Sequence, residues 1–465
     1  MAFTSYDFLL FFFIIFIIYW LIRERHWQNL ILLVASYYFY GYIQAWYAIM
    51  LGLSTSIDYF LARAIVFYPN RKKIFILISL FMNLGVLAFF KYYNFFISDV
   101  IAFLNTFNIH TGTLLISIAL PAGLSFFTLK KLGYMIDVSR GTLQPTNNFI
   151  NFALYVSFFP QLIAGPIERP QKLIPQIESQ RQWKAEFFYQ AWPLLVMGFF
   201  KKIVIADSVQ VIVNRIFGFD EPSILLLLIG GLGYTLQILA DFSAYTDISR
   251  GIAYLIGFET SENFNKPYLS LTPTDFWNRW HITLSTWLRD YIFFPIRRTL
   301  LQYKLHESLT LALPPIVTMF ISGIWHGANL NFVIWGLYYG ILIAIYQLIG
   351  IRGDWKTNTK IKTLFAWFVM FCFIVFGWII FRSPSINWLI NIFSVSPLIP
   401  NSNELIFALI SINIVVVYTI PLVVKQMMHK SITPSWLYAI YYAVATLLII
   451  IFTNSSNSDF IYFQF

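Results

Sequence analysis

Long apolar runs follow one another along most of the chain. The clearest cover residues 8–21, 30–53, 74–90, 365–381 and 437–452. A helix needs roughly 20 predominantly apolar residues to cross the hydrocarbon core of a bilayer, and several of these runs approach or reach that length. The pattern therefore predicts an all-α polytopic membrane protein with about eleven transmembrane helices.

The candidate spans, some of them partial, lie near residues 7–22, 28–48, 49–67, 74–92, 113–130, 149–166, 187–206, 223–241, 309–328, 331–350, 363–382, 403–424 and 435–453. Charges and prolines break the pattern between residues 242 and 300, where we expect re-entrant or interfacial helices. Such backbone at membrane depth must be buried in protein or line a wet cavity. No linker or internal repeat is evident, which indicates one integral-membrane domain over residues 1–465.

Composition and charge agree with a membrane location. Hydrophobic residues make up 58% of the chain and charged residues 11%, whereas a soluble globular domain carries about 25% charge. The net charge of +10 lies in short clusters such as Lys201-Lys202. Such clusters orient membrane proteins from the cytoplasmic side, and they are compatible with an anionic cofactor from the cytosol. No basic stripe stands outside the membrane segments, so we expect a lipid bilayer and no nucleic acid as partner.

The first apolar run has no basic residue before it, whereas Arg23 and Arg25 follow it. A cleavable signal peptide has the opposite charge order, so we expect a retained first span and an N-terminus outside the cytoplasm. Cys372 is the only cysteine, which excludes an intrachain disulfide and a cysteine-based metal site.

Polar and aromatic residues crowd into residues 272–291. Thr272 is a candidate N-cap and Pro273 suits the first helical position, so we expect one helix that ends at Pro295. Along it, one side carries polar residues and the other aromatic ones. The polar side consists of Asp275, Asn278, His281 or Ile282, Ser285 and Arg289, and the other side of Phe276, Trp280, Thr283, Trp287 and Tyr291. The polar side faces either a cavity or, in the alternative, the headgroup layer of the membrane surface.

His326 lies near the end of residues 311–330, which contain no Lys, Arg, Asp or Glu. Gly323 and Gly327 are spaced for close approach of another backbone, and Trp325 and Asn329 flank the histidine. Two roles remain open, a packing residue or a general base, since an ordinary histidine pKa of about 6.5 suits proton transfer at neutral pH.

Asp241 also stands in an apolar segment, with Gln237 and Tyr245 on the same helical face. An intramembrane carboxylate is costly, and it serves either function or attachment to a neighbouring helix. Of other chemistries, the sequence has no Gly-x-Ser-x-Gly elbow, no phosphate-binding glycine loop and no His-Glu-x-x-His motif. The spacing of His281, His306 and His326 is unlike a compact metal ligand set, so we expect no metal site.

Proline-rich residues 158–170 cannot form a continuous helix. They form either a loop facing an internal cavity or an ordinary loop at the membrane edge. Pro121 and Gly123 predict a kink shortly before them, with packing and functional roles both open.

The most distinctive motifs lie within residues 120–382. They are residues 160–167, 241–248, 263–268, 276–291, 325–328 and 335–336, and the ending at residues 460–465 adds to them. Together these motifs resemble the membrane-bound O-acyltransferases, and most of all their bacterial branch typified by alginate O-acetylation. Lys130-Lys131 and Ser249-Arg250 depart from the family pattern.

The resemblance implies a helical bundle around a central tunnel in a bacterial inner membrane. It implies that His326 is the catalytic histidine, acting as general base, and that His281 and Asn278 orient the acceptor or the thioester. Trp325 would shape a narrow passage. Further candidate lining residues are Ser285, Asp241, Asn329 and Arg289.

The family resemblance also implies substrates and partners. The acyl donor would be cytoplasmic acetyl-CoA, with no tightly bound cofactor, and the acceptor an exported polysaccharide. An extracytoplasmic partner that resembles serine hydrolases would assist. Peptidoglycan O-acetylation and D-alanyl transfer to teichoic acid are alternatives within the family. A polytopic transporter is the alternative from another class, although the internal repeat common in transporters is not evident.

Overall fold

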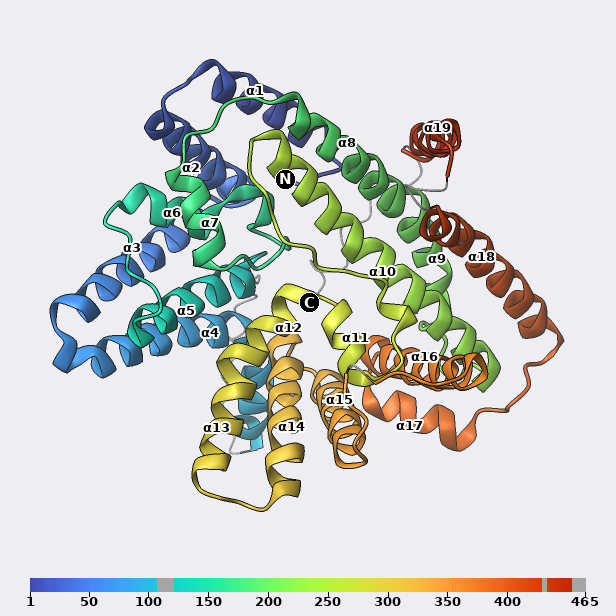
Figure 1. Cartoon of the computed structure of the whole chain (residues 1–465). Helices are drawn as coiled ribbons and strands as arrows, with labels where there is room; N and C mark the ends of the chain where they lie inside the picture. The colour runs from blue at the N-terminus through green and yellow to red at the C-terminus, as the bar shows by residue number, and fades with distance from the viewer. Residues whose placement is uncertain (107–120, 354, 429–432, 454–465) are drawn as a thin grey trace. The chain divides into compact units, whose positions relative to one another are not determined.

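The computed structural model describes residues 1–106, 121–353, 355–428 and 433–453, and the regular elements in these ranges are all helical (Figure 1). Within them, eight helices are long and apolar enough to cross a membrane. These are Ala45–Phe67, Pro69–Tyr93, Ile224–Leu255, Glu307–His326, Leu330–Leu348, Lys360–Arg382, Ser402–Met427 and Ser435–Phe452. The predicted all-α, multi-pass membrane architecture is thus confirmed, while the count of about eleven spans stays a prediction.

By its internal contacts the chain forms two compact units. The first comprises Met1–Trp192 with Ser249–Ser261. Its helices are α1 (Tyr6–Leu21), α2 (Arg25–Gly41), α3 (Ala45–Phe67), α4 (Lys72–Thr106), α5 (Leu124–Arg140), α6 (Phe149–Ser157), α7 (Pro170–Glu178) and the first part of α8 (Ala185–Phe199). The predicted span near residues 113–130 lies partly outside the described residues, and the prediction of one domain over the whole chain stays a prediction.

The second unit comprises Pro193–Ile248 with Glu262–Phe465. It contains the π-helical turn η3 (Phe200–Ala206), α9 (Asp207–Ile216), most of α10 (Ile224–Leu255), η4 (Pro267–Leu269), α11 (Pro273–Arg279), α12 (Ile282–Leu288), the π-helical turn η5 (Arg289–Phe293) and α13 (Phe294–Gln302). Then follow α14 (Glu307–His326), α15 (Leu330–Leu348), α16 (Lys360–Arg382), α17 (Ile386–Val395), α18 (Ser402–Met427) and α19 (Ser435–Phe452).

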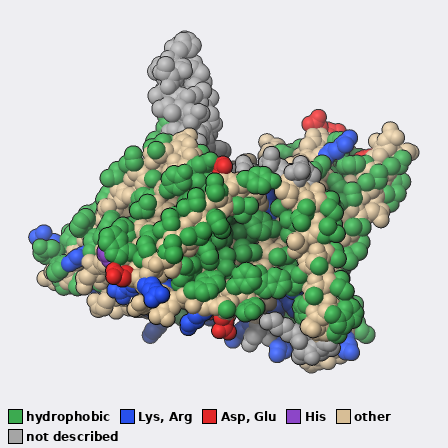
Figure 2. All heavy atoms as spheres, turned by 90° about the horizontal axis from the view of Figure 1, so that it is seen from above, with side chains coloured by type: hydrophobic (Ala, Val, Ile, Leu, Met, Phe, Trp, Pro, Cys, Tyr) green, Lys and Arg blue, Asp and Glu red, His purple; other side chains and the backbone are tan. Residues whose placement is uncertain are grey.

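Much of the exposed surface is apolar, as expected for a protein in a lipid bilayer. Hydrophobic side chains cover most of the face shown in Figure 2, and charged side chains are sparse there. On α18 and α19, Ile406, Val417 and Ile450 are each at least 58% exposed. Side chains of this kind are stable in contact with lipid, so these helices need no protein cover on that side.

One candidate span, near residues 149–166, does not form a continuous helix. Helix α6 ends at Ser157, and a short 3₁₀ turn over Phe159–Gln161 follows. Pro160 and Pro166 lack the N–H that a helix interior requires, and their rings clash with the preceding turn. Residues 158–168 are nevertheless buried, which agrees with a loop that faces the protein interior, and their position relative to the membrane stays a prediction.

Two glycines allow this loop to pack closely. A Cβ on Gly123 would stand 2.3 Å from the Leu162 carbonyl oxygen, and a Cβ on Gly165 would stand 2.7 Å from Ser249 Oγ. Gly123 also has a φ of +80°, a conformation that side chains disfavour. The kink predicted near Pro121 and Gly123 is therefore the place where α5 begins against the buried loop.

The expectation of re-entrant or interfacial helices from residue 242 onward is wrong for residues 242–255. Helix α10 continues without interruption to Leu255 and carries Asp241 and Asp247 within it. Both carboxylates have lysine partners on η3, at 2.9 Å from Lys202 and 2.7 Å from Lys201. Because a paired charge is far less costly to bury than an isolated one, the helix tolerates them.

Candidate functional site

Helices α14 and α15 form a tightly packed hairpin in the second unit. A Cβ on Gly323 would lie 2.2 Å from the Phe332 carbonyl oxygen, and one on Gly336 would lie 2.3 Å from that of Met319. The two glycines face each other, since the same Cβ on Gly323 would be 3.3 Å from Gly336 Cα. In a membrane, helices associate through close packing at small residues of this kind. The close approach predicted at Gly323 is therefore present, and it fixes the end of α14, where His326 is the last residue.

Four aromatic rings surround the imidazole of His326. The ring centroids of Trp325, Trp335 and Phe381 lie 4.9, 5.1 and 5.2 Å from it, each nearly perpendicular, and Phe332 follows at 6.4 Å. These rings come from α14, α15 and α16. His326 is 8% exposed. The arrangement holds the imidazole in one orientation while leaving a small part of it accessible.

His281 is placed by a break in the chain that the sequence did not reveal. Residues 273–302 form α11, α12, η5 and α13 in place of the single predicted helix. At the break His281 adopts a left-handed conformation, with φ +41° and ψ +55°. The predicted N-cap at Thr272 is confirmed, because its hydroxyl accepts the Asp275 N–H at 3.1 Å. Pro295 does not end a helix but lies in the first turn of α13.

Asn263 stabilises the break from outside the helix. Its side-chain oxygen accepts from the Thr283 N–H at 3.1 Å and from the Thr283 hydroxyl at 2.7 Å, and its carbonyl accepts from Ile282 N–H at 3.0 Å. These bonds satisfy donors at the start of α12 that no helical carbonyl can reach. Sequence reasoning gave Asn263 no role, although it lies in one of the family-like motifs.

The side chain of His281 is 1% exposed and meets the Phe242 ring at 4.7 Å. His281 lies outside the candidate membrane spans. Burial lowers the pKa of His281 to about 3, with a smaller opposing contribution from a backbone hydrogen bond. The imidazole is therefore neutral at physiological pH, so it can position a substrate by hydrogen bonding but cannot supply a positive charge.

An aromatic core connects the two histidines within the second unit. From Phe242 the ring contacts continue to Trp280 at 6.5 Å, from Trp280 to Trp378 at 4.8 Å, and from Trp378 to Phe381 at 5.7 Å. Phe381 then meets His326. His281 and His326 thus contact opposite ends of one chain of rings, and a shared site for them stays a prediction.

Asp241 belongs to a buried ion cluster. Lys202 on η3 lies 2.9 Å from Asp241 and 2.9 Å from Asp207. The neighbouring Lys201 donates to Asp247 at 2.7 Å and to the Ser243 hydroxyl at 2.8 Å. These contacts are of the kind expected if Asp241 attaches its helix to a neighbouring helix. The two lysines are 8% and 1% exposed, so their charges are compensated inside the protein.

The other predicted lining residues are more peripheral. Asn278, Arg289 and Asn329 are exposed, and Ser285 is half-buried with its hydroxyl donating to the Trp280 carbonyl at 3.0 Å. Arg289 pairs with Asp290 at 3.0 Å. Of the candidate set, the structure brings Trp325 into contact with His326 and buries His281 and Asp241. Among the described residues, no group of three or more His, Cys, Asp and Glu is arranged to hold a metal ion.

The two lysines that depart from the family pattern lie in the first unit. Lys131 pairs with buried Asp58 at 3.4 Å, and the same carboxylate accepts from Ser79 at 2.6 Å and Asn83 at 2.8 Å. Lys130 lies over the Tyr155 ring at 4.9 Å. Both lysines are therefore internal, and the cluster around Asp58 ties α3, α4 and α5 together.

Comparison with known proteins places these features in a family. The model of the membrane-bound O-acyltransferase family matches residues 139–381. The "Probable alginate O-acetylase AlgI" of Pseudomonas aeruginosa is 34% identical over 83% of this chain and 73% of its own length. The peptidoglycan O-acetyltransferase of Helicobacter pylori is 32% identical over 77% of this chain and 71% of its own. The teichoic acid D-alanyltransferase of Bacillus subtilis is 29% identical over 56% of this chain and 68% of its own length.

The matched region contains α10 to α15 and most of α16, and therefore both histidines and the rings between them. The relatives cover most of the chain, not the matched region alone. The chain belongs to the membrane-bound O-acyltransferase family, and it is an acyltransferase.

Proposed function

We propose that this protein transfers an acetyl group from cytoplasmic acetyl-CoA to a hydroxyl of an exported, alginate-like cell-surface polysaccharide. The observation that carries the proposal is the enclosure of His326 by Trp325, Trp335 and Phe381 at the tightly packed end of α14. The similarity to the alginate O-acetylase over 83% of the chain supports the choice of acetyl group and acceptor.

In this mechanism His326 is the general base. The acceptor hydroxyl gives its proton to an imidazole nitrogen, and its oxygen forms a bond to the thioester carbonyl carbon. The carbon–sulfur bond then breaks, and coenzyme A leaves as the thiol after the imidazolium returns the proton. General-base assistance contributes on the order of 10²–10⁴-fold in rate. The aromatic rings around His326 would keep bulk water, a competing acceptor, away from the acyl group.

His281 has a positioning role in this scheme. Because it is buried and neutral, it would orient the acceptor or the thioester by a hydrogen bond, with Asn278 at the exposed side of the same stretch. Trp325 would narrow the passage to His326. Candidates for lining the outer part of this passage are Ser285, Arg289 and Asn329. Asp241 would support the passage through its ion pair with Lys202.

The membrane arrangement that goes with this function has about eleven spans and re-entrant or interfacial helices around a central tunnel. The protein lies in the bacterial inner membrane with its N-terminus outside the cytoplasm. Acetyl-CoA enters from the cytoplasm as a substrate, and no cofactor is tightly bound. An extracytoplasmic acetyltransferase that resembles serine hydrolases assists the transfer to the polysaccharide.

Two further acceptors fit the same fold, peptidoglycan and, with a D-alanyl group from a carrier-protein thioester, teichoic acid. The similarity to the Helicobacter pylori and Bacillus subtilis enzymes favours keeping both as alternatives. A transporter would differ from all of these. It would move substrate across proteoliposomes without any acetyl transfer.

Mass spectrometry of the cell-surface polymers, with and without this protein, tests the proposal. We expect the acetyl content of one exported polysaccharide to fall in its absence, and to return with the wild-type chain but not with His326→Ala. Unchanged polysaccharide acetylation would contradict the proposal, and loss of acetyl from peptidoglycan or of D-alanine from teichoic acid would identify the alternative acceptor.

A further inference from the structure

The second unit has an apolar groove of about 580 Å³ between α10, α16 and α18, with η4 along one wall. Two polar side chains of the wall donate hydrogen bonds to backbone carbonyls within it. The Tyr268 hydroxyl donates to the Thr235 carbonyl at 2.7 Å, and the Trp367 indole N–H donates to the Tyr268 carbonyl at 2.8 Å. The groove therefore offers hydrocarbon surface along its length, which suits an aliphatic chain and not a sugar polymer.

The groove is somewhat longer than one membrane leaflet is thick. Its lining on α18 extends from Ile412 to Gln426, which corresponds to about 21 Å of helix at 1.5 Å per residue. One leaflet contributes about half of a hydrocarbon core that is roughly 30 Å thick. The three helices that line the groove are candidate membrane spans, so the groove lies beside lipid. An acyl chain of one leaflet fits this length.

A cation marks one end of the groove. Lys266 precedes η4, is exposed, and has no ion-pair partner among the described residues. The bond from Trp367 to Tyr268 joins this turn to α16 about two turns after that helix begins, and Gln426, in the last turn of α18, also lines the groove. An ammonium and an amide beside an apolar channel are groups that bind a phosphate at the head of a hydrocarbon chain.

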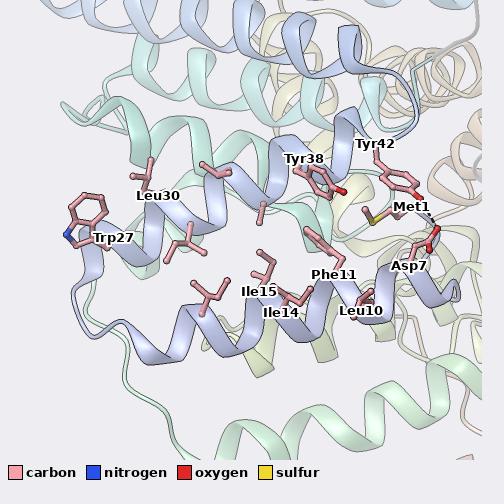
Figure 3. Close-up of a pocket in the computed structure, with 14 residues that line it drawn as sticks. Met1, Asp7, Leu10, Phe11, Ile14, Ile15, Trp27, Leu30, Tyr38 and Tyr42 are labelled. Carbon is pink, nitrogen blue, oxygen red and sulfur yellow. Dashed lines mark hydrogen bonds between the residues drawn. The ribbon is translucent and has the colours of Figure 1, made fainter.

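A second apolar groove in the first unit provides a contrast. It has a volume of about 800 Å³ and lies between α1 and α2 (Figure 3). At one end the Asp7 carboxylate accepts a hydrogen bond from the Tyr42 hydroxyl at 2.7 Å. A carboxylate repels phosphate, so this groove lacks the charge that an anionic headgroup needs. The positive charge at Lys266 therefore distinguishes the groove in the second unit from this groove in the first unit.

We propose that the groove between α10, α16 and α18 binds one acyl chain of an anionic phospholipid, whose phosphate is held by Lys266. The site is separate from the acetyl-transfer chemistry proposed for His326. It would be occupied by a resident lipid of the membrane, which fills the space between α10 and α18 and stabilises their packing.

Native mass spectrometry of the purified full-length protein tests this site. The protein is delipidated in detergent and titrated with phosphatidylglycerol or phosphatidylcholine, and bound lipid is counted. We expect one retained phosphatidylglycerol in the wild type and about fivefold weaker retention in Lys266→Gln, the factor that one Lys near a lipid surface is worth. Lys304→Gln is the matched control, because Lys304 is also exposed and has nearly the same backbone φ, +49° against +48°, but lies outside the groove.

Val416→Trp gives an independent test that does not depend on charge. Val416 lines the groove and is 54% exposed, so an indole there would occupy the path of the acyl chain without disturbing the buried core. We expect this variant to lose retention of phosphatidylglycerol while it keeps the elution volume of the wild type. Equal retention of both lipids by the wild type, or retention unchanged in Lys266→Gln and Val416→Trp, would overturn the proposal.

Discussion

The indole of Trp335 stands at 86° to the imidazole of His326, with ring centroids 5.1 Å apart. Trp335 is 1% exposed and comes from α15, whereas His326 ends α14. An edge-to-face arrangement of this kind is a favoured geometry for aromatic pairs. Trp335 therefore sets the direction in which the nitrogens of His326 point, and in the proposed mechanism it would act through the histidine.

The first prediction concerns this positioning role. Trp335→Phe keeps an aromatic ring but shortens it, so the imidazole gains freedom to rotate. We expect kcat to fall about tenfold or more, since small misplacements of a reacting group are costly, with a smaller change in KM. Steady-state kinetics measure both, and Trp183→Phe, at an exposed site in the first unit, is the control. Wild-type kcat in Trp335→Phe would show that the indole has no part in holding His326.

The second prediction concerns the hairpin. Gly323→Ala would place a methyl group 2.2 Å from the Phe332 carbonyl oxygen, a backbone atom that cannot move without separating α14 from α15. We expect a loss of about 1–3 kcal/mol or more in stability, measured as a lower thermal midpoint in detergent. Gly85→Ala is the matched control, because a Cβ added there has no atom of the described residues within 4 Å and alanine is the better helix former. Equal midpoints for the two variants would contradict the close packing.

The third prediction concerns the ion cluster on η3. Lys202→Met removes the cation that Asp207 and Asp241 share, and both carboxylates stay in a buried environment. Breaking a buried pair in this way costs about 3–5 kcal/mol. We therefore expect poor recovery of folded protein and a much lower thermal midpoint, whereas Lys184→Met, at an exposed site, leaves both unchanged. A midpoint within 1 °C or so of the wild type would mean that the cluster does not support the fold.

The fourth prediction is a pH dependence that arises from His281. Its pKa is about 3 in the folded protein, against about 6.5 for a free histidine, so between these values the unfolded state binds a proton that the folded state does not. Stability therefore falls as the pH falls through this window, by about 2 kcal/mol at pH 5. The difference between the thermal midpoints at pH 7.5 and pH 5 measures this loss of stability.

His281→Gln should lose less stability than the wild type over the same pH interval, because glutamine takes up no proton on unfolding. His26→Gln, at an exposed site, should behave as the wild type does. If the wild type and His281→Gln lose equal stability, His281 is not buried in its neutral form.

The helices could be predicted from the sequence wherever one apolar run meets lipid, as for α14, α15, α16, α18 and α19. Local signals also held at Thr272, whose side chain and following proline suffice to begin a helix. The family motifs and His326 were likewise visible in the sequence, because they depend on residue identity alone. Their roles in the reaction stay predictions.

The remaining features depend on partners distant in the chain. Nothing near His281 forbids a helix, and the break there is stabilised by Asn263, which precedes α11. Asp241 interrupts an apolar pattern, yet α10 continues because Lys202 from another segment compensates the charge. The enclosure of His326 draws on Phe381, more than fifty residues later. Pairings of this kind leave no periodic signal.

Acetyl transfer by the purified full-length protein, supplied with labelled acetyl-CoA and the polymer from the cell surface, tests the central claim most directly. His326→Ala should lower the rate of labelled polymer formation by at least about 10²-fold, while His281→Ala causes a milder loss. Circular dichroism and elution volume verify that both variants are folded. Transfer by His326→Ala at the wild-type rate would contradict the assignment of His326 as the catalytic base.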